Sequence, residues 1–158
     1  MTTRREILKA AATAPAIAVA SAAPVLGSGT AAQARRETIG APGPGGLPFS
    51  AAVRYGDLLF VSGNVGNNPG TLDLVPGGTT AQTRQALENI KATLELAGSS
   101  MADVLKATVF LADIDDYAAM NDVYRTYFPD DPPARSTLAA SGLAIGALVE
   151  IEVIDAAR

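Results

Sequence analysis

The sequence of 158 residues contains no cysteine and no histidine. Without cysteine there is no disulfide framework, no thiolate nucleophile and no thiolate ligand for a metal ion. Without histidine there is no imidazole base, no Ser-His-Asp triad and no ordinary zinc site. Any chemistry must therefore use carboxylates, hydroxyl groups, arginine, lysine, backbone groups and water.

Positive charge is also in short supply. Twelve lysines and arginines stand against sixteen aspartates and glutamates, which gives a formal net charge of −4. This balance is a poor match for nucleic acid, which needs a basic face on the protein. A small anionic substrate remains compatible with it, because one arginine in a pocket can outweigh the global field locally.

The first 34 residues have the composition of an export signal. A basic head over residues 4–9 precedes an Ala-rich, weakly hydrophobic run over residues 10–26. Ala32-Gln33-Ala34 then supplies a small-x-small cleavage pattern. We therefore predict a signal peptide over residues 1–34, cleaved after Ala34, and a periplasmic protein. The alternative is a tail that is retained on a cytoplasmic protein.

The head of this segment, TRREILK over residues 3–9, resembles a twin-arginine signal. Such a signal is an address read by a receptor and not an anchor. The apolar run that follows is short and broken by Pro15 and Pro24, so we expect no stable membrane anchor. Cleavage would leave nine basic and fifteen acidic residues, a net charge of −6, because three basic residues and one acidic residue are removed.

Residues 35–48, RRETIGAPGPGGLP, are rich in glycine and proline. This composition predicts a leader without regular secondary structure. The folded domain is predicted over residues 49–158. Within it, the continuous apolar run Leu58–Val61 predicts a strand that is covered on both faces.

Hydrophobic periodicity predicts the element order β-β-α-β-α-β-β. Strands are predicted over 51–55 and 58–62 around a Gly56-Asp57 turn, and further strands over 105–111, 135–140 and 148–154. The first helix is predicted from Thr79-Thr80 to Ala97, with a stop at Gly98, and it should bury Leu87, Ile90 and Leu94. The second helix is predicted from Asp113 to Pro129, and it should bury Tyr117, Met120, Tyr124 and Tyr127 or Phe128. This order fits an α+β domain, one mixed sheet with two helices on one face. The uncovered sheet face predicts self-association.

Two charges stand in the apolar, small-residue segment 132–152, PPARSTLAASGLAIGALVEIE. A charge inside a buried segment is costly unless it is paired or used. Glu150 and Glu152 share one face of a strand by the period-two rule, and the apolar residues beside them share the other. For Arg135 and Glu150, a solvated surface and a pocket at a subunit interface both remain open on this reasoning.

Several motifs resemble the reactive intermediate deaminase family, RidA/YjgF. The most specific is Pro133-Ala134-Arg135-Ser136, followed fifteen residues after the arginine by Glu150-Ile151-Glu152. Supporting matches are LFVSG over 59–63, TRQALENI over 83–90, VFLAD over 109–113 and the stretch 120–124. The resemblance spans roughly residues 49–154.

The resemblance implies a chorismate-mutase-like α+β fold that forms a homotrimer, with a pocket at each of three subunit interfaces and with no metal or organic cofactor. It implies hydrolysis of 2-imino acids, the tautomers of reactive enamines, to 2-keto acids and ammonia. Arg135 matches the arginine that binds the substrate carboxylate through its planar fork. Glu150 matches the glutamate that orients or activates water. Further substrate-binding positions are implied at Thr137, Ser62, Gly63, Phe49 and Tyr127 or Phe128.

The chain departs from the family pattern at several positions. Phe49 stands where many members have tyrosine, Thr137 replaces a common cysteine, and residues 139–148 lack the usual Leu-Pro-Lys turn. The alternative function is therefore a non-catalytic binder or sensor of small carboxylic acids on the same trimer. A weaker alternative is an interaction or chaperone-like role of the trimer surface.

Overall fold

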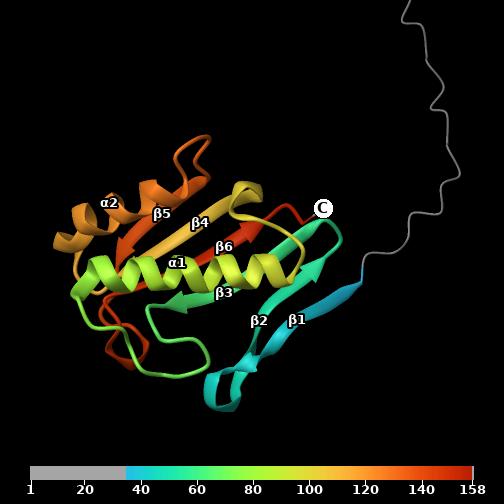
Figure 1. Ribbon diagram of the computed structural model, residues 1–158, viewed down its shortest axis with the longest axis horizontal. Helices are drawn as coiled ribbons and strands as arrows, with labels where there is room; N and C mark the ends of the chain where they lie inside the picture. The colour runs from blue at the N-terminus through green and yellow to red at the C-terminus, as the bar shows by residue number, and fades with distance from the viewer. Residues whose placement is uncertain (1–34, 158) are drawn as a thin grey trace, which may run out of the picture. The chain divides into compact units, whose positions relative to one another are not determined.

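A computed structural model describes residues 35–157 of the chain. The predicted signal segment, residues 1–34, lies outside the described residues. Figure 1 shows two helices packed on one face of a six-stranded sheet. The predicted α+β class is therefore confirmed. The elements are β1 (Arg36–Gly43), β2 (Leu47–Tyr55), β3 (Leu58–Val65), α1 (Gly78–Leu96), β4 (Val104–Leu111), α2 (Tyr117–Tyr127), β5 (Ala134–Ala139) and β6 (Val149–Asp155), with short 3-10 turns between some of them.

The sheet has the order β1-β2-β3-β6-β4-β5. All neighbouring strands are antiparallel except β4 and β5, which are parallel, so the sheet is mixed as predicted. The β2–β3 hairpin turns at Gly56-Asp57, which confirms that prediction. The strand that carries Glu150, β6, lies in the middle of the sheet, whereas the strand that carries Arg135, β5, forms one edge.

The prediction that residues 35–48 form a leader without secondary structure is wrong. Residues 36–43 form β1, which pairs with β2 in a register that places Thr38 opposite Val53 and Ile39 opposite Ala52. Most of β1 is exposed, and Ile39 is its one large apolar residue packed against the core. An edge strand of this kind needs no apolar alternation, and its glycines and prolines coincide with register shifts. The sequence pattern therefore concealed it.

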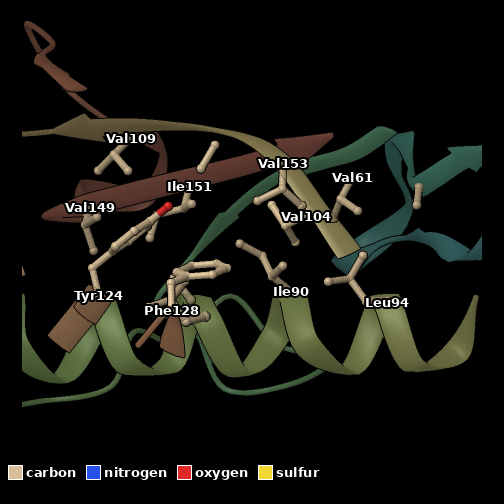
Figure 2. Packing of buried hydrophobic residues seen from close by; sticks show 14 of the residues in the cluster. Val61, Ile90, Leu94, Val104, Val109, Tyr124, Phe128, Val149, Ile151 and Val153 are labelled. Carbon is tan, nitrogen blue, oxygen red and sulfur yellow. The ribbon is translucent and has the colours of Figure 1, made fainter. Parts of the chain in front are cut away.

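The hydrophobic core lies between the helices and the sheet. Leu87, Ile90 and Leu94 of α1 are fully buried, as their spacing predicts. Figure 2 shows Ile90 and Leu94 facing the valines of the sheet, with Tyr124 and Phe128 beside Val149 and Ile151. Burial of each such aliphatic side chain stabilises the fold by about 1.5–3 kcal/mol.

The helix boundaries follow local signals in the sequence. Gly98 adopts φ +77°, and the amide groups of Gly98 and Ser99 donate to the carbonyl oxygens of Glu95 and Leu94, so α1 stops where predicted. In α2, Met120 and Tyr124 are buried as predicted. Tyr117 is not, because it begins the helix and is 43% exposed beside Arg135.

The sheet face away from the helices is open within one chain. Leu59 and Val61 of β3 are buried, but Leu58 and Phe60 are 38% and 43% exposed. The prediction that this strand is covered on both faces is therefore wrong for a single chain, because no described element covers the second face. In residues 35–157, no helix has both the length and the apolar character that crossing a bilayer requires.

Candidate active site

Glu150 lies against the backbone of Gly63. The alternation along β6 buries Val149 and Ile151 and leaves Glu150 half-buried on the open face of the sheet, the face it shares with Glu152 as predicted. The β3–β6 pairing shifts register between Val61 and Asn64, next to Gly63. A Cβ atom at position 63 would collide with the Glu150 carboxylate. A side chain at position 63 would therefore force that carboxylate to move.

A cavity of about 800 Å³ opens beside Glu150. This volume lies within the range of small-molecule sites in proteins. The polar part of its lining next to Glu150 comes from the end of β3, and large apolar residues come from three separate segments. The residues concerned are Ser62, Gly63, Asn64 and Glu150, and Leu47, Phe49, Leu72 and Ile145.

Ser62 has a structural role in this cavity. Its hydroxyl group donates to the carbonyl oxygen of Ser50 at 2.7 Å, and the side-chain amide of Asn64 donates to the carbonyl oxygen of Ser62 at 2.7 Å. The Ser62 proton is thus engaged, and its oxygen is left as an acceptor for a ligand. Ser62 is not arranged as a nucleophile, since no base lies within hydrogen-bond reach of its hydroxyl group among these contacts.

The Glu150 carboxyl group is tuned by its surroundings. Burial raises the pKa of Glu150, and the negative charge of Glu152 on the same strand face raises the pKa further. A carboxylate with a raised pKa accepts a proton more readily than an ordinary glutamate. Glu150 is therefore the group in this cavity best suited to act as a base.

We expect Gly63→Ala to displace the Glu150 carboxylate, because the added methyl group would occupy the same space. The displaced carboxylate would be better solvated, so its pKa should fall towards the ordinary glutamate value. Carbon-13 NMR of the side-chain carboxyl group measures this pKa. Gly142→Ala is the matched control, because nothing lies within 4 Å of a Cβ atom there and Gly142 has no positive φ. An unchanged Glu150 pKa in Gly63→Ala would contradict the proposed contact.

Arg135 lies on the other side of the sheet. In β5 it pairs with the buried Ala107 of β4, so it faces the helices. Its guanidinium carbon is 4.5 Å from the ring centroid of Tyr124 and 5.8 Å from that of Tyr117, and Nη2 donates to the Tyr117 hydroxyl oxygen at 3.3 Å. Both aromatic rings thus hold the guanidinium group through cation–π contacts.

No carboxylate within residues 35–157 lies within ion-pair distance of Arg135. Burial raises the pKa of Tyr124 to about 12, against the opposing effect of Arg135, so this phenol stays neutral. The guanidinium group lines a second cavity of about 370 Å³ together with Asn121, Tyr124, Arg125, Phe128, Pro132 and Pro133. Arg135 is therefore a positioned cation whose charge is available to an anionic ligand.

Within one chain, Arg135 and Glu150 neither pair nor share a cavity. Arg135 is in register with Ala107 and Glu150 is in register with Phe110, three residues further along β4. Successive side chains alternate between the faces, so the two charges point to opposite faces of the sheet. A joint site would need these groups from two different chains.

The other predicted site residues divide between the two cavities. Phe49, Ser62 and Gly63 line the cavity of Glu150, and Phe128 lines that of Arg135. Tyr127 and Thr137 line neither. The Tyr127 hydroxyl group donates to Glu88 at 2.6 Å, and the Thr137 hydroxyl oxygen is buried without a hydrogen-bond partner.

Ile145 is a residue of the site that sequence reasoning missed. It has φ +52°, and Asp131 is the other non-glycine residue with a positive φ between residues 35 and 157. A left-handed conformation costs an L-residue about 1–2 kcal/mol, and branching at Cβ makes it worse. No sequence signal marks the position, because glycine or asparagine is expected where the backbone is left-handed. Among residues 35–157 there is also no acidic cluster suited to a metal ion.

The sequence is similar to those of known proteins. Residues 39–157 match the family model described as Endoribonuclease L-PSP. A RutC family protein of Pyrococcus horikoshii is 48% identical over 117 residues, which cover 74% of this chain and 92% of that protein. A 2-iminobutanoate/2-iminopropanoate deaminase of Capra hircus is 45% identical over 107 residues, which cover 68% of this chain and 78% of that protein.

Solved structures show the same fold. The crystal structure of RidA from an Antarctic Psychrobacter species has a TM-score of 0.70 at 39% identity, over 76% of this chain and 98% of that one. The YjgF gene product of E. coli has a TM-score of 0.70 at 37% identity, over 77% of this chain and 99% of that one. The α+β architecture is therefore shared with these proteins.

Proposed function

The chain belongs to the Endoribonuclease L-PSP family, which includes the RidA and YjgF proteins, and on this premise we propose that it hydrolyses 2-imino acids and their enamine tautomers to 2-keto acids and ammonia. The observation that carries the proposal is the Glu150 carboxylate, which lies over Gly63 in a cavity and has a raised pKa. The similarity to the 2-iminobutanoate/2-iminopropanoate deaminase of Capra hircus supports the same substrate class. The acidic balance of the chain argues against an RNA substrate.

In the proposed reaction, water is the nucleophile and Glu150 is the base. The carboxylate accepts a proton from water as the oxygen attacks the imine carbon, and it passes this proton to the nitrogen, which gives a tetrahedral carbinolamine. The carboxylate then accepts the remaining hydroxyl proton and passes it to the nitrogen, the C–N bond breaks as the C=O bond forms, and ammonia and the 2-keto acid leave. Because an imine carbon is already electrophilic, positioning and proton transfer by one carboxylate suffice, and neither cysteine nor histidine is needed.

Arg135 is proposed to bind the carboxylate of the imino acid. Its guanidinium group is held on the rings of Tyr124 and Tyr117 and has no carboxylate partner among the described residues. A guanidinium fork binds a carboxylate with two parallel charge-assisted hydrogen bonds. Binding the carboxylate in this way would fix the orientation of the imine carbon.

The two groups require an assembly, because they point to opposite faces of the sheet in one chain. We propose a homotrimer in which Arg135 of one subunit meets the Glu150 cavity of the next. The open sheet face supplies apolar surface for such contacts, since Leu58, Phe60 and Leu138 are 38–45% exposed. An exposed apolar face of this kind is typical of a protein–protein interface.

The proposal is tested by generating 2-imino acids in situ with an amino-acid oxidase and measuring the rate of 2-keto acid and ammonia release. We expect the purified protein to accelerate release beyond spontaneous hydrolysis. Rates equal to those with heat-denatured protein would contradict the proposal. Thermal stabilisation by 2-keto acids without any acceleration would instead favour the binder or sensor.

The pH dependence of kcat/KM should reflect the ionisation of the Glu150 carboxyl group. The carboxylate must be ionised to accept a proton, so kcat/KM should fall as pH falls through the raised pKa of Glu150, above the ordinary glutamate value. Glu152→Gln removes the neighbouring negative charge and should move this acid limb to lower pH. Steady-state rates at closely spaced pH values check the shift. Glu37→Gln changes an exposed residue of β1 and should leave the acid limb of the kcat/KM profile in place. An acid limb that does not move in Glu152→Gln would contradict its assignment to Glu150.

A further inference from the structure

The turn between β5 and β6 holds Ile145 in a strained conformation. Ile145 has φ +52° and ψ +18°, and it sits in the 3-10 turn Ala144–Gly146. Burial in the core does not offset this strain, because the side chain is 46% exposed. A strained residue that contributes nothing to the core points to a role at a binding site.

The surrounding backbone fixes this conformation. The amide groups of Gly146 and Ala147 donate to the carbonyl oxygens of Leu143 and Ala144 at 3.2 and 3.0 Å. Next in the chain, the amide of Leu148 donates to the buried side chain of Gln82 in α1 at 2.8 Å. The turn is therefore held from both sides of Ile145.

The cavity that Ile145 lines has other large apolar residues in its lining. Leu47, Phe49 and Leu72 line the same cavity and are 39–46% exposed. Among the described residues of this lining, Glu150 is the one charged side chain. A ligand placed at Glu150 could thus put an apolar group against these residues, whereas a second carboxylate would find no cation in this lining and would be repelled by Glu150.

We propose that Ile145 is a specificity-determining residue that contacts the side chain of the substrate. It favours 2-imino acids with a branched aliphatic side chain over the 2-imino acid derived from alanine, whose side chain is a methyl group. This inference rests on the proposed function. The strained backbone aims a branched side chain that glycine, the residue better suited to this φ, would lack. The site should therefore discriminate by apolar contact, with acidic side chains disfavoured.

The test compares two substitutions that both tolerate a left-handed backbone. Ile145→Gly removes the side chain, and Ile145→Asn keeps much of its size but makes it polar. With imino acids generated from leucine and from alanine, the ratio of the two kcat/KM values should fall roughly tenfold in both variants. Ile145→Gly should melt no lower than the unmodified protein, because glycine relieves the strain.

Ile114→Gly is the matched control. Ile114 is 52% exposed in another 3-10 turn and lines neither cavity, so its loss should leave the leucine-to-alanine ratio unchanged. A ratio that stays at the unmodified value in both Ile145 variants would overturn the inference while leaving imine hydrolysis intact.

A binding measurement separates this inference from the proposed function. Calorimetry of 4-methyl-2-oxopentanoate and pyruvate gives two dissociation constants without any turnover. If the unmodified protein hydrolyses no imine, the proposed function fails, but tighter binding of 4-methyl-2-oxopentanoate that is lost in Ile145→Gly would still support the contact. Equal dissociation constants that Ile145→Gly does not change would overturn it.

Discussion

Replacing Glu150 with glutamine is expected to lower kcat for imine hydrolysis by about 100-fold or more. The amide has the same shape as the carboxylate and fits over Gly63, but it cannot accept a proton from water. Because Glu150 is proposed to act on water and not to hold the carboxylate of the substrate, KM should change little. Rates of 2-keto acid release at saturating substrate measure the effect.

Glu152→Gln provides the control for this substitution. Glu152 lies on the same strand and the same sheet face two residues away, and it is exposed. Away from the acid limb, its substitution should leave kcat within a few-fold of the unmodified value. A Glu150→Gln protein with unaltered kcat would rule out Glu150 as the base, and loss of turnover with ligand binding retained would confirm the separation of roles.

Replacing Arg135 with alanine is expected to lower kcat/KM by about 100-fold or more, because two parallel charge-assisted hydrogen bonds to the substrate carboxylate are lost. Arg135→Lys keeps the charge but loses the planar guanidinium fork, so its kcat/KM should lie between that of Arg135→Ala and that of the unmodified protein. Steady-state kinetics at several substrate concentrations check both variants. Arg84→Ala, on the exposed face of α1, should have no comparable effect.

Loss of the arginine also removes its contact with Tyr124, so thermal melting must show that the variant is folded. A folded Arg135→Ala protein with the unmodified kcat/KM would exclude Arg135 from substrate binding.

Mixing the two inactive variants tests whether the site lies between subunits. Arg135→Ala supplies an intact Glu150 cavity, and Glu150→Gln supplies an intact arginine. If subunits assort at random in a ring, about one interface in four combines the two intact halves, so about a quarter of the activity should return. Refolding the two proteins together and separately measures this recovery. No recovery in mixed assemblies would contradict the intersubunit site.

The sequence pattern predicted the elements whose two faces differ in polarity. In β6, alternation placed Glu150 and Glu152 opposite the buried valines and isoleucine, and the structure agrees. It did not reveal β1, because an exposed edge strand carries little apolar alternation and its glycines and prolines resemble those of a loop. Hydrophobic alternation therefore predicts strands that have one buried face, and it does not predict strands that are mostly exposed.

The candidate site was only partly accessible from the sequence. The absence of histidine and cysteine limited the possible chemical groups to carboxylates, hydroxyl groups, arginine, lysine and the backbone, and the resemblance to the RidA/YjgF motifs then pointed to Arg135 and Glu150. Their separation onto opposite faces depends on the β4–β5 and β4–β6 registers, which only the folded sheet defines. The left-handed backbone of Ile145 likewise runs against the preference of its residue type, and the chain next to its turn is anchored by Gln82.

The central position of β6 has a consequence for how the chain folds. β6 is the last strand of the described residues, yet it joins β3 to β4, and its residue Asp155 is in register with Leu59, far back in the sequence. The β2–β3 hairpin can form early from local contacts, but it cannot join β4 until β6 has been synthesised. Pairing over so long a separation slows folding and leaves strand edges exposed in the meantime. We therefore expect the two halves of the sheet to be joined only after β6 is made, in one late and cooperative step.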